Sequence, residues 1–282
     1  MRPELFSIPA LGPLSEPIGV HAYGVAIAVG FVLATLLCVR RARQWGYSEP
    51  ERFGDLAFYV LLIGLLGSRL LFIAVNWREY SAHPIEVLSF WRGGLVFYGG
   101  FIATQIYGYW WARRHQIHYL ELADLMIPAL ALNHAFGRLG CFAAGCCYGK
   151  PTMMPWGAHF PADSVVALGQ HAQGLIPLGS PPHPVHPTQL YEAGVELVLF
   201  AVIMLAPRKF RGQHLLTWLI VYPIARSLIE MYRGDAERGF VIGDWLSTSQ
   251  FVSLLVALAA IGLVVYLVRS RSVVTEKGLD HG

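Results

Sequence analysis

The sequence predicts an all-α membrane protein with about seven transmembrane helices and a small subdomain on the outer face. Of the 282 residues, 55% are hydrophobic and only 14% are charged, whereas a soluble domain carries about a quarter charged residues. The mean hydropathy of +0.48 points the same way, because the apolar surface exceeds what one core can bury and lipid must cover the rest. We expect residues 1–282 to form a single integral membrane domain.

Seven apolar stretches are each near the length that crosses about 30 Å of hydrocarbon. In chain order they are His21–Cys38, Leu56–Val75, Leu95–Trp111, Leu120–Ala135, Leu190–Ala206, Leu215–Tyr232 and Phe251–Val268. The stretch Leu120–Ala135 contains Glu121, Asp124 and Pro128, so it is the one most open to being short, tilted or broken. No signal-peptide pattern precedes His21, and we expect the first span to stay uncleaved.

Basic residues gather in alternate connections between these stretches. Those connections hold 12 of the 21 lysines and arginines: Arg40, Arg41, Arg43, Arg52, Arg113, Arg114, Arg208, Lys209, Arg211, Arg269, Arg271 and Lys277. Since cytoplasmic loops carry the excess of basic residues, we expect a multi-pass protein with its N-terminus outside and its C-terminus in the cytoplasm. The long outer connection, residues 138–187, is rich in proline and glycine, and we expect an ordered loop subdomain there.

Several charged residues lie inside the apolar stretches, where each costs about 2.5–3.5 kcal/mol and usually serves a function. Arg69, Arg138 and Arg226 all lie in the expected outer half of the membrane. Four-residue spacing places three pairs each on one helix face: His134 with Arg138, Glu192 with Glu196, and Arg226 with Glu230, with Arg233 continuing the last face. An ion pair that neutralises itself explains one such pair. Several arginines near one leaflet favour a lipid-phosphate site.

Two glycine clusters accompany these charges. Gly93, Gly94, Gly99 and Gly100 bracket one element, and either a close approach to a ligand or small-residue helix packing explains them. For the second cluster, from Gly137 to Gly149, we expect a re-entrant or loop segment.

The motifs, taken in order, resemble the prolipoprotein diacylglyceryl transferase family. The segment Gly137–Gly145 resembles its signature G-R-x-G-N-F-x-N-G-E, and Gly93–Gly100 is similar to its element G-G-M-S-F-H-G-G. Further similar segments are His21–Gly24, Gly67–Arg69, His186–Glu192, Arg226–Arg233 and Ser249–Gln250. Each motif is weak alone, but the ordered set covers nearly the whole chain.

The resemblance implies a bacterial inner-membrane enzyme that transfers the diacylglyceryl group of phosphatidylglycerol to the lipobox cysteine of a prolipoprotein signal peptide. A thioether forms and glycerol phosphate leaves. By resemblance, Arg138 and Arg226 hold the lipid phosphate, Glu230 orients Arg226, and Tyr23 lines the lipid site. The other candidate substrate-binding residues are Arg69, His134, Gln189, Tyr191, Glu192 and Arg233. We expect no cofactor, and we predict no metal because the cysteines lack Cys-x2-Cys spacing. The net charge of +3 is too small and dispersed to indicate nucleic acid.

The chain departs from the family pattern at the expected reactive residues. Tyr98 occupies the position of the family's histidine and is a candidate catalytic residue, although a tyrosine is a poor base at neutral pH. His134, His186 or Glu192 must then accept the thiol proton, unless the histidine is not required.

Three cysteines form a second departure. Cys141 and Ala144 replace the signature's two asparagines, Cys146 replaces its glutamate, and Cys147 follows. Buried unreactive thiols, a disulfide and a metal site all remain open for this cluster.

These departures leave room for a divergent paralogue that uses another acceptor or has lost catalysis. Two alternatives from other classes are a membrane lipid transporter, because intramembrane charges also mark translocation pathways, and a thiol-redox enzyme built on Cys146 and Cys147. The absence of a visible internal repeat counts against a transporter.

Overall fold

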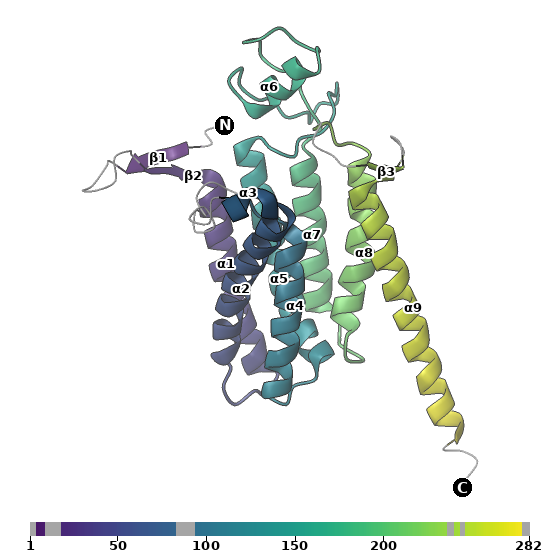
Figure 1. Ribbon diagram of the computed structural model, residues 1–282. Helices are drawn as coiled ribbons and strands as arrows, with labels where there is room; N and C mark the ends of the chain where they lie inside the picture. The colour runs from purple at the N-terminus through teal and green to yellow at the C-terminus, as the bar shows by residue number, and fades with distance from the viewer. Residues whose placement is uncertain (1–3, 9–17, 83–93, 236–239, 243–245, 278–282) are drawn as a thin grey trace. The chain divides into compact units, whose positions relative to one another are not determined.

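The computed structural model describes residues 4–8, 18–82, 94–235, 240–242 and 246–277, with the backbone alone at residues 4, 7, 8, 18, 79, 82, 240–242, 246 and 266–277. Gly93 of the first glycine cluster therefore lies outside the described residues. The helices are α1 (Ala22–Gln44), α2 (Arg52–Val75), α3 (Trp77–Ala82), α4 (Phe97–Arg114), α5 (Tyr119–Ala144), α6 (Val165–Ala172), α7 (Thr188–Leu205), α8 (Gln213–Glu230) and α9 (Thr248–Lys277) (Figure 1). Two short antiparallel sheets pair β1 (Glu4–Ile8) with β2 (Ile18–His21), and β3 (Phe240–Ile242) with β4 (Leu246–Ser247).

The chain divides into two compact units. The first comprises residues 1–34 and 127–282, and the second comprises residues 35–126. The predicted single membrane domain stays a prediction.

A helix is present at each of the seven apolar stretches, which confirms a mostly helical protein. Among the described residues, four of these helices are long and apolar enough to cross a membrane by length and composition: α1, α2, α7 and the part of α9 from Thr248 to Val265. Many of their leucines and valines are exposed, as on helices that face lipid. These properties fit a multi-pass membrane protein, while membrane crossing by α4, α5 and α8 stays a prediction.

Helix α5 differs from the sequence expectation because it is neither short nor broken. It runs for 26 residues, with Pro128 inside it, and includes Gly137 and Gly140 of the second glycine cluster. Proline removes the helical hydrogen bond to the carbonyl four residues earlier, which here is that of Asp124. The buried Arg41 donates from Nη2 to this Asp124 oxygen at 3.3 Å, so a side chain supplies a donor that the helix lacks. The proposed re-entrant or loop segment is thus wrong for Gly137 and Gly140.

In the second unit, glycines allow α2 and α4 to pack closely. A Cβ on Gly67 would lie 2.6 Å from the carbonyl oxygen of Gly99, and one on Gly100 would lie 2.7 Å from that of Gly64. Such backbone contacts are typical of small-residue packing between membrane helices. The structure therefore assigns Gly99 and Gly100 to helix packing.

We expect Gly99→Ala to destabilise the protein by about 1–3 kcal/mol, because the new methyl group would overlap the backbone of Gly67. The apparent midpoint of thermal unfolding in detergent measures this effect. Gly108→Ala is the matched control on α4, since its Cβ would meet nothing nearer than 3.8 Å. Equal midpoints for the two variants would contradict the packing assignment.

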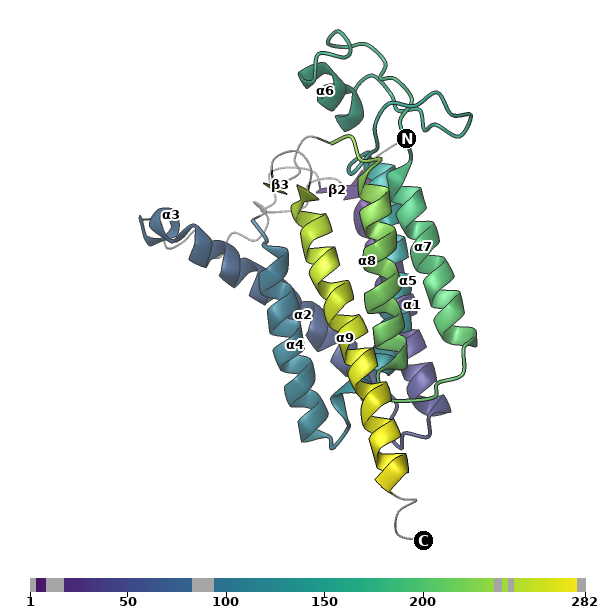
Figure 2. The ribbon, with the colours of Figure 1, turned by 90° about the vertical axis from the view of Figure 1, so that its right-hand side faces the viewer.

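In the first unit, α7 and α8 lie side by side and run antiparallel, and α9 packs against α8 (Figures 1 and 2). The connection from α5 to α7 lies beyond the ends of these two helices and carries α6 (Figure 2). The N-cap of α6, Ser164, accepts a hydrogen bond from the amide of Ala167. A small cluster of buried residues stabilises this connection: Tyr148, Phe160, Val166 and Val185. Its place on the outer face of a membrane stays a prediction.

Candidate functional site

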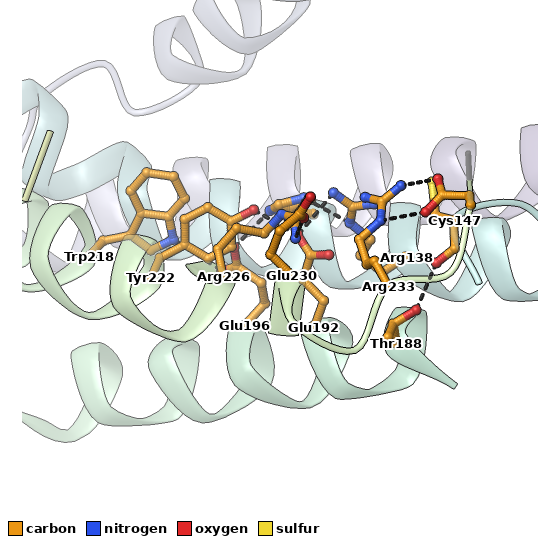
Figure 3. Close-up of polar contacts among 12 residues, drawn as sticks. Arg138, Cys147, Thr188, Glu192, Glu196, Trp218, Tyr222, Arg226, Glu230 and Arg233 are labelled. Carbon is orange, nitrogen blue, oxygen red and sulfur yellow. Dashed lines mark hydrogen bonds and ion pairs between the residues drawn. The ribbon is translucent and has the colours of Figure 1, made fainter. Parts of the chain in front are cut away.

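Three helices of the first unit bring polar side chains together at four-residue spacing. Helix α5 contributes His134 and Arg138. Helix α7 contributes Glu192 and Glu196, and α8 contributes Trp218, Tyr222, Arg226 and Glu230 (Figure 3). Because residues four apart share one helix face, each helix turns a polar stripe toward the other two.

Glu192 lies at the centre of this polar network. Its Oε1 is 2.9 Å from Nη2 of Arg138 and 3.6 Å from Nε of Arg226, and it accepts a hydrogen bond from the hydroxyl of Tyr222 at 2.7 Å. The Glu192 side chain is 3% exposed, and those of Arg138 and Arg226 are 17% and 10% exposed. One buried carboxylate on α7 therefore joins an arginine of α5 to an arginine of α8.

Glu196 fixes the imidazole of His134. Its Oε1 lies 2.7 Å from Nδ1 of His134, and its Oε2 accepts a hydrogen bond from Nε1 of Trp218 at 3.0 Å. Nε of Arg138 donates to Nε2 of His134 at 3.3 Å. Since an arginine can only donate, these partners assign the neutral tautomer with its proton on Nδ1.

Arg226 has a second carboxylate partner on its own helix. Its Nη1 lies 2.5 Å from Oε2 of Glu230, one turn further along α8. The intrahelical ion pair, one of the two interpretations that the sequence left open, is thus present, but Arg226 also faces Glu192. Buried charges require such pairing, and removing one partner of a buried pair costs about 3–5 kcal/mol.

Sequence reasoning missed two members of the network, Trp218 and Tyr222. Both continue the stripe of Arg226 and Glu230 at intervals of four residues toward the start of α8. The indole and phenol rings stack with centroids 4.7 Å apart. Four-residue spacing, which indicated the pair Arg226 and Glu230, also predicts Trp218 and Tyr222 once the N–H of tryptophan and the hydroxyl of tyrosine are counted as polar groups.

Arg233 lies elsewhere than expected. Helix α8 ends at Glu230, so Arg233 does not continue the helical face but lies in the turn that follows. It makes a paired contact with the carboxylate of Asp235, with Nε donating to Oδ1 at 2.9 Å. The turn is held by backbone hydrogen bonds to the connection after α5, including that from the amide of Lys150 to the carbonyl of Tyr232 at 2.7 Å.

The first turn of α7 holds the backbone that follows α5. The hydroxyl of Thr188 donates to the carbonyl of Cys147 at 2.7 Å, and Nε2 of Gln189 donates to the carbonyl of Cys146 at 2.6 Å. Both side chains are buried. Gln189 therefore holds the backbone of the turn that contains Cys146 and Cys147.

Tyr191 belongs to a separate hydrogen-bonded group. Its hydroxyl accepts from Nε1 of Trp156 at 2.9 Å and lies 3.2 Å from Nδ1 of His186.

The three cysteines of the signature region have free thiols and lie close together. The Sγ atoms of Cys141, Cys146 and Cys147 are all within 4.8 Å of one another. Hydrogen bonds with Cys141 and Cys146 lower the pKa of Cys147, and the positive charges of Arg233 and Arg138 lower it further, against the effect of burial. Hydrogen bonds with Cys141 and Cys147, together with burial, raise the pKa of Cys146. The arrangement thus favours one thiolate, at Cys147.

The remaining predicted residues lie outside the polar network of α5, α7 and α8. Tyr23 of α1 lies against Gly140, where a Cβ would be 3.1 Å from its ring. Arg69 and Tyr98 belong to the second unit. The buried Arg69 donates to the carbonyl of Gly94 at 3.3 Å and lies over the rings of Phe72 and Tyr80. Roles for these residues in a lipid site stay predictions.

Known proteins resemble this chain along almost its whole length. The family model described as prolipoprotein diacylglyceryl transferase matches residues 9–266. A phosphatidylglycerol–prolipoprotein diacylglyceryl transferase of Clostridium tetani is 34% identical over 268 residues, which cover 94% of this chain and 97% of the relative.

Two further relatives with this enzyme name show a similar level of identity. That of Clostridium perfringens, designated 2, is 34% identical and covers 86% of this chain and 89% of its own. The relative from Stenotrophomonas maltophilia is 34% identical, and the match covers 93% of this chain and 92% of the relative. The resemblance found in the motifs is confirmed, and the chain belongs to the prolipoprotein diacylglyceryl transferase family.

Proposed function

We propose that this protein transfers the diacylglyceryl group of phosphatidylglycerol to the lipobox cysteine of prolipoprotein signal peptides at the bacterial inner membrane. Membership of the family and relatives that carry this enzyme name support the reaction. The observation that carries the chemistry is the convergence of Arg138 and Arg226 on Glu192.

The two guanidinium groups suit a phosphate that must be bound and then released as a leaving group. A guanidinium has five N–H donors, so it can hold a carboxylate and still donate to a second anion. Phosphate oxygens accept such forked donors well, and the partly buried surroundings strengthen the attraction. Glu192 would keep both arginines in place before the lipid arrives, which is electrostatic preorganisation.

The reaction would proceed by displacement at the glycerol carbon that bears the phosphate ester. The peptide thiol loses its proton to a base, and the thiolate sulfur then forms a bond to this carbon. The carbon–oxygen bond breaks, its electron pair leaves with glycerol phosphate, and a thioether remains. Arg138 and Arg226 would neutralise the charge that develops on the leaving phosphate.

We further propose that all seven long helices cross the membrane, with the N-terminus and the connection carrying α6 outside and the C-terminus in the cytoplasm. The basic residues at the ends of α1 and α4 support this orientation.

Mass spectrometry of a lipobox peptide tests the proposed reaction. We expect purified protein and phosphatidylglycerol to add one diacylglyceryl group to the peptide cysteine and to release an equal amount of glycerol phosphate. A peptide with serine in place of that cysteine should gain no mass. Phosphatidylglycerol that stays intact, while a relative is active in parallel, would overturn the proposal in favour of a paralogue with another task.

A further inference from the structure

The clustered thiols of Cys141, Cys146 and Cys147 have no role in the reaction proposed above. Cys141 lies in the last turn of α5, and the other two follow the helix end. All three are partly buried, and their sulfur atoms lie within 4.8 Å of one another. Two sulfurs bound to one zinc ion, at about 2.3 Å each, can be at most about 4.6 Å apart. Small side-chain movements would thus bring all three to one ion.

The backbone after α5 is shaped to bring these thiols together. Gly145 has a φ of +76° and Cys147 a φ of +58°. The left-handed conformation costs a residue with a Cβ roughly 1–2 kcal/mol, so neighbouring structure must stabilise it at Cys147. The buried Thr188 and Gln189 of α7 bind the carbonyls of Cys147 and Cys146 and supply this support. Backbone strain held in place by buried side chains is common at functional sites.

The charges around the cluster suit a metal–thiolate centre. Three thiolates with one monovalent or divalent cation carry a net negative charge. Arg138 lies three residues before Cys141 on α5, and its positive charge and that of Arg233 act on Cys147. Thiolate ligands select soft ions such as Cu(I) and Zn(II) over hard ions such as Mg²⁺.

We propose that Cys141, Cys146 and Cys147 together bind one thiophilic d¹⁰ metal ion, Cu(I) or Zn(II), through three thiolates. The ion would join the end of α5 to the turn that Thr188 and Gln189 hold. It would thereby fix the helical turn that carries Arg138. Three sulfur ligands suit Cu(I) in trigonal geometry, or Zn(II) with one further position open to water.

Metal loading of the purified full-length protein tests this proposal. Protein reduced under anaerobic conditions is titrated with Cu(I) or with Zn(II), each against a competing chelator, and X-ray absorption at the metal edge identifies the ligands. We expect one ion per chain with three sulfur ligands at about 2.3 Å. The arm with the tighter binding identifies the metal.

Cysteine variants locate the site. The variants Cys147→Ser and Cys146→Ser should each bind the ion at least about 100-fold more weakly than the wild type. Loss of a residue that only supports a metal ligand already weakens binding by about 10–100-fold, so loss of a ligand should cost at least as much. Cys38→Ser is the matched control, because Cys38 is the chain's remaining cysteine and lies in the second unit, against the sulfur of Met126. It should bind as tightly as the wild type.

Three results would overturn the proposal. One is the absence of binding in both arms when all four thiols are reduced. Another is a sulfur count below three in the wild type, a measurement that does not depend on how the variants fold. The third is weakened binding in Cys38→Ser that equals the loss in Cys147→Ser. Binding is measured without lipid or peptide, so its failure is distinct from a failure of the proposed transferase reaction.

Discussion

Replacing Arg138 with alanine is expected to lower kcat/KM for diacylglyceryl transfer by about 10²–10³-fold. This is the range seen when one donor to a developing oxyanion is removed, and it corresponds to about 2.7–4 kcal/mol. Arg138 donates to Glu192 and His134 from a side chain that is 17% exposed, so its loss removes both a phosphate donor and part of the network. The initial rate of peptide modification measures the effect.

Arg138→Lys separates charge from geometry. Lysine keeps the positive charge but lacks the planar fork that binds two oxygens of one anion. We therefore expect a rate between those of the wild type and Arg138→Ala. A matched control is Arg43→Ala, because Arg43 and Glu51 form a 3.0 Å ion pair with side chains 68% and 71% exposed. Such exposed pairs contribute about 0–1 kcal/mol, and a wild-type rate is expected for this control.

Replacing Glu192 with glutamine should give a different kinetic result, with a kcat at least about 100-fold lower and a KM for phosphatidylglycerol that does not rise. The change removes the negative charge between Arg138 and Arg226 while keeping the size of the side chain. The arginines would then lose a competing anion but also the group that positions them. Binding of the phosphate should persist, whereas its orientation for displacement should be lost.

A double variant tests whether Glu192 acts through Arg138. The combined loss in Arg138→Ala/Glu192→Gln should be smaller than the sum of the separate losses by about 0.5–3 kcal/mol, as is usual for residues in contact. Additive losses would show that Glu192 acts independently of Arg138. Glu51→Gln, the partner of Arg43 in the exposed pair, should behave as the wild type.

The positions of the long helices could be predicted from the sequence, but the continuity of α5 could not. Length and hydropathy were sufficient for α1, α2, α7 and the first part of α9. Pro128 favoured a broken segment, because proline lacks a backbone N–H and one helical hydrogen bond is therefore missing. The donor that replaces it comes from Arg41, some 83 residues away in the chain. Such a distant compensation has no local signal.

The candidate site was predicted in part for a similar reason. Four-residue spacing placed His134 with Arg138, Glu192 with Glu196, and Arg226 with Glu230, and the structure has each pair on one helix face. Spacing within one helix does not say which faces of different helices meet. The central place of Glu192 and the support from Tyr222 therefore became visible only in the structure.

For Arg233, the prediction from spacing was wrong. Its spacing from Glu230 suggested one more helical turn, yet α8 ends at Glu230 and Arg233 binds Asp235. The chain leaves the helix because the next residues form backbone hydrogen bonds with the connection after α5, as that between Gly234 and Tyr148 illustrates. A tertiary contact thus sets the helix end.

Lipid binding without turnover tests most directly whether the two arginines hold the phosphate. In the absence of peptide, purified protein is titrated with short-chain phosphatidylglycerol and with the matching diacylglycerol, which lacks the phosphate. We expect the wild type and Arg43→Ala to prefer phosphatidylglycerol by at least about tenfold, or about 1.4 kcal/mol, and Arg138→Ala to lose this preference. If Arg138→Ala kept the full preference while transfer was lost, the phosphate would be held elsewhere, and Arg138 would have no part in binding it.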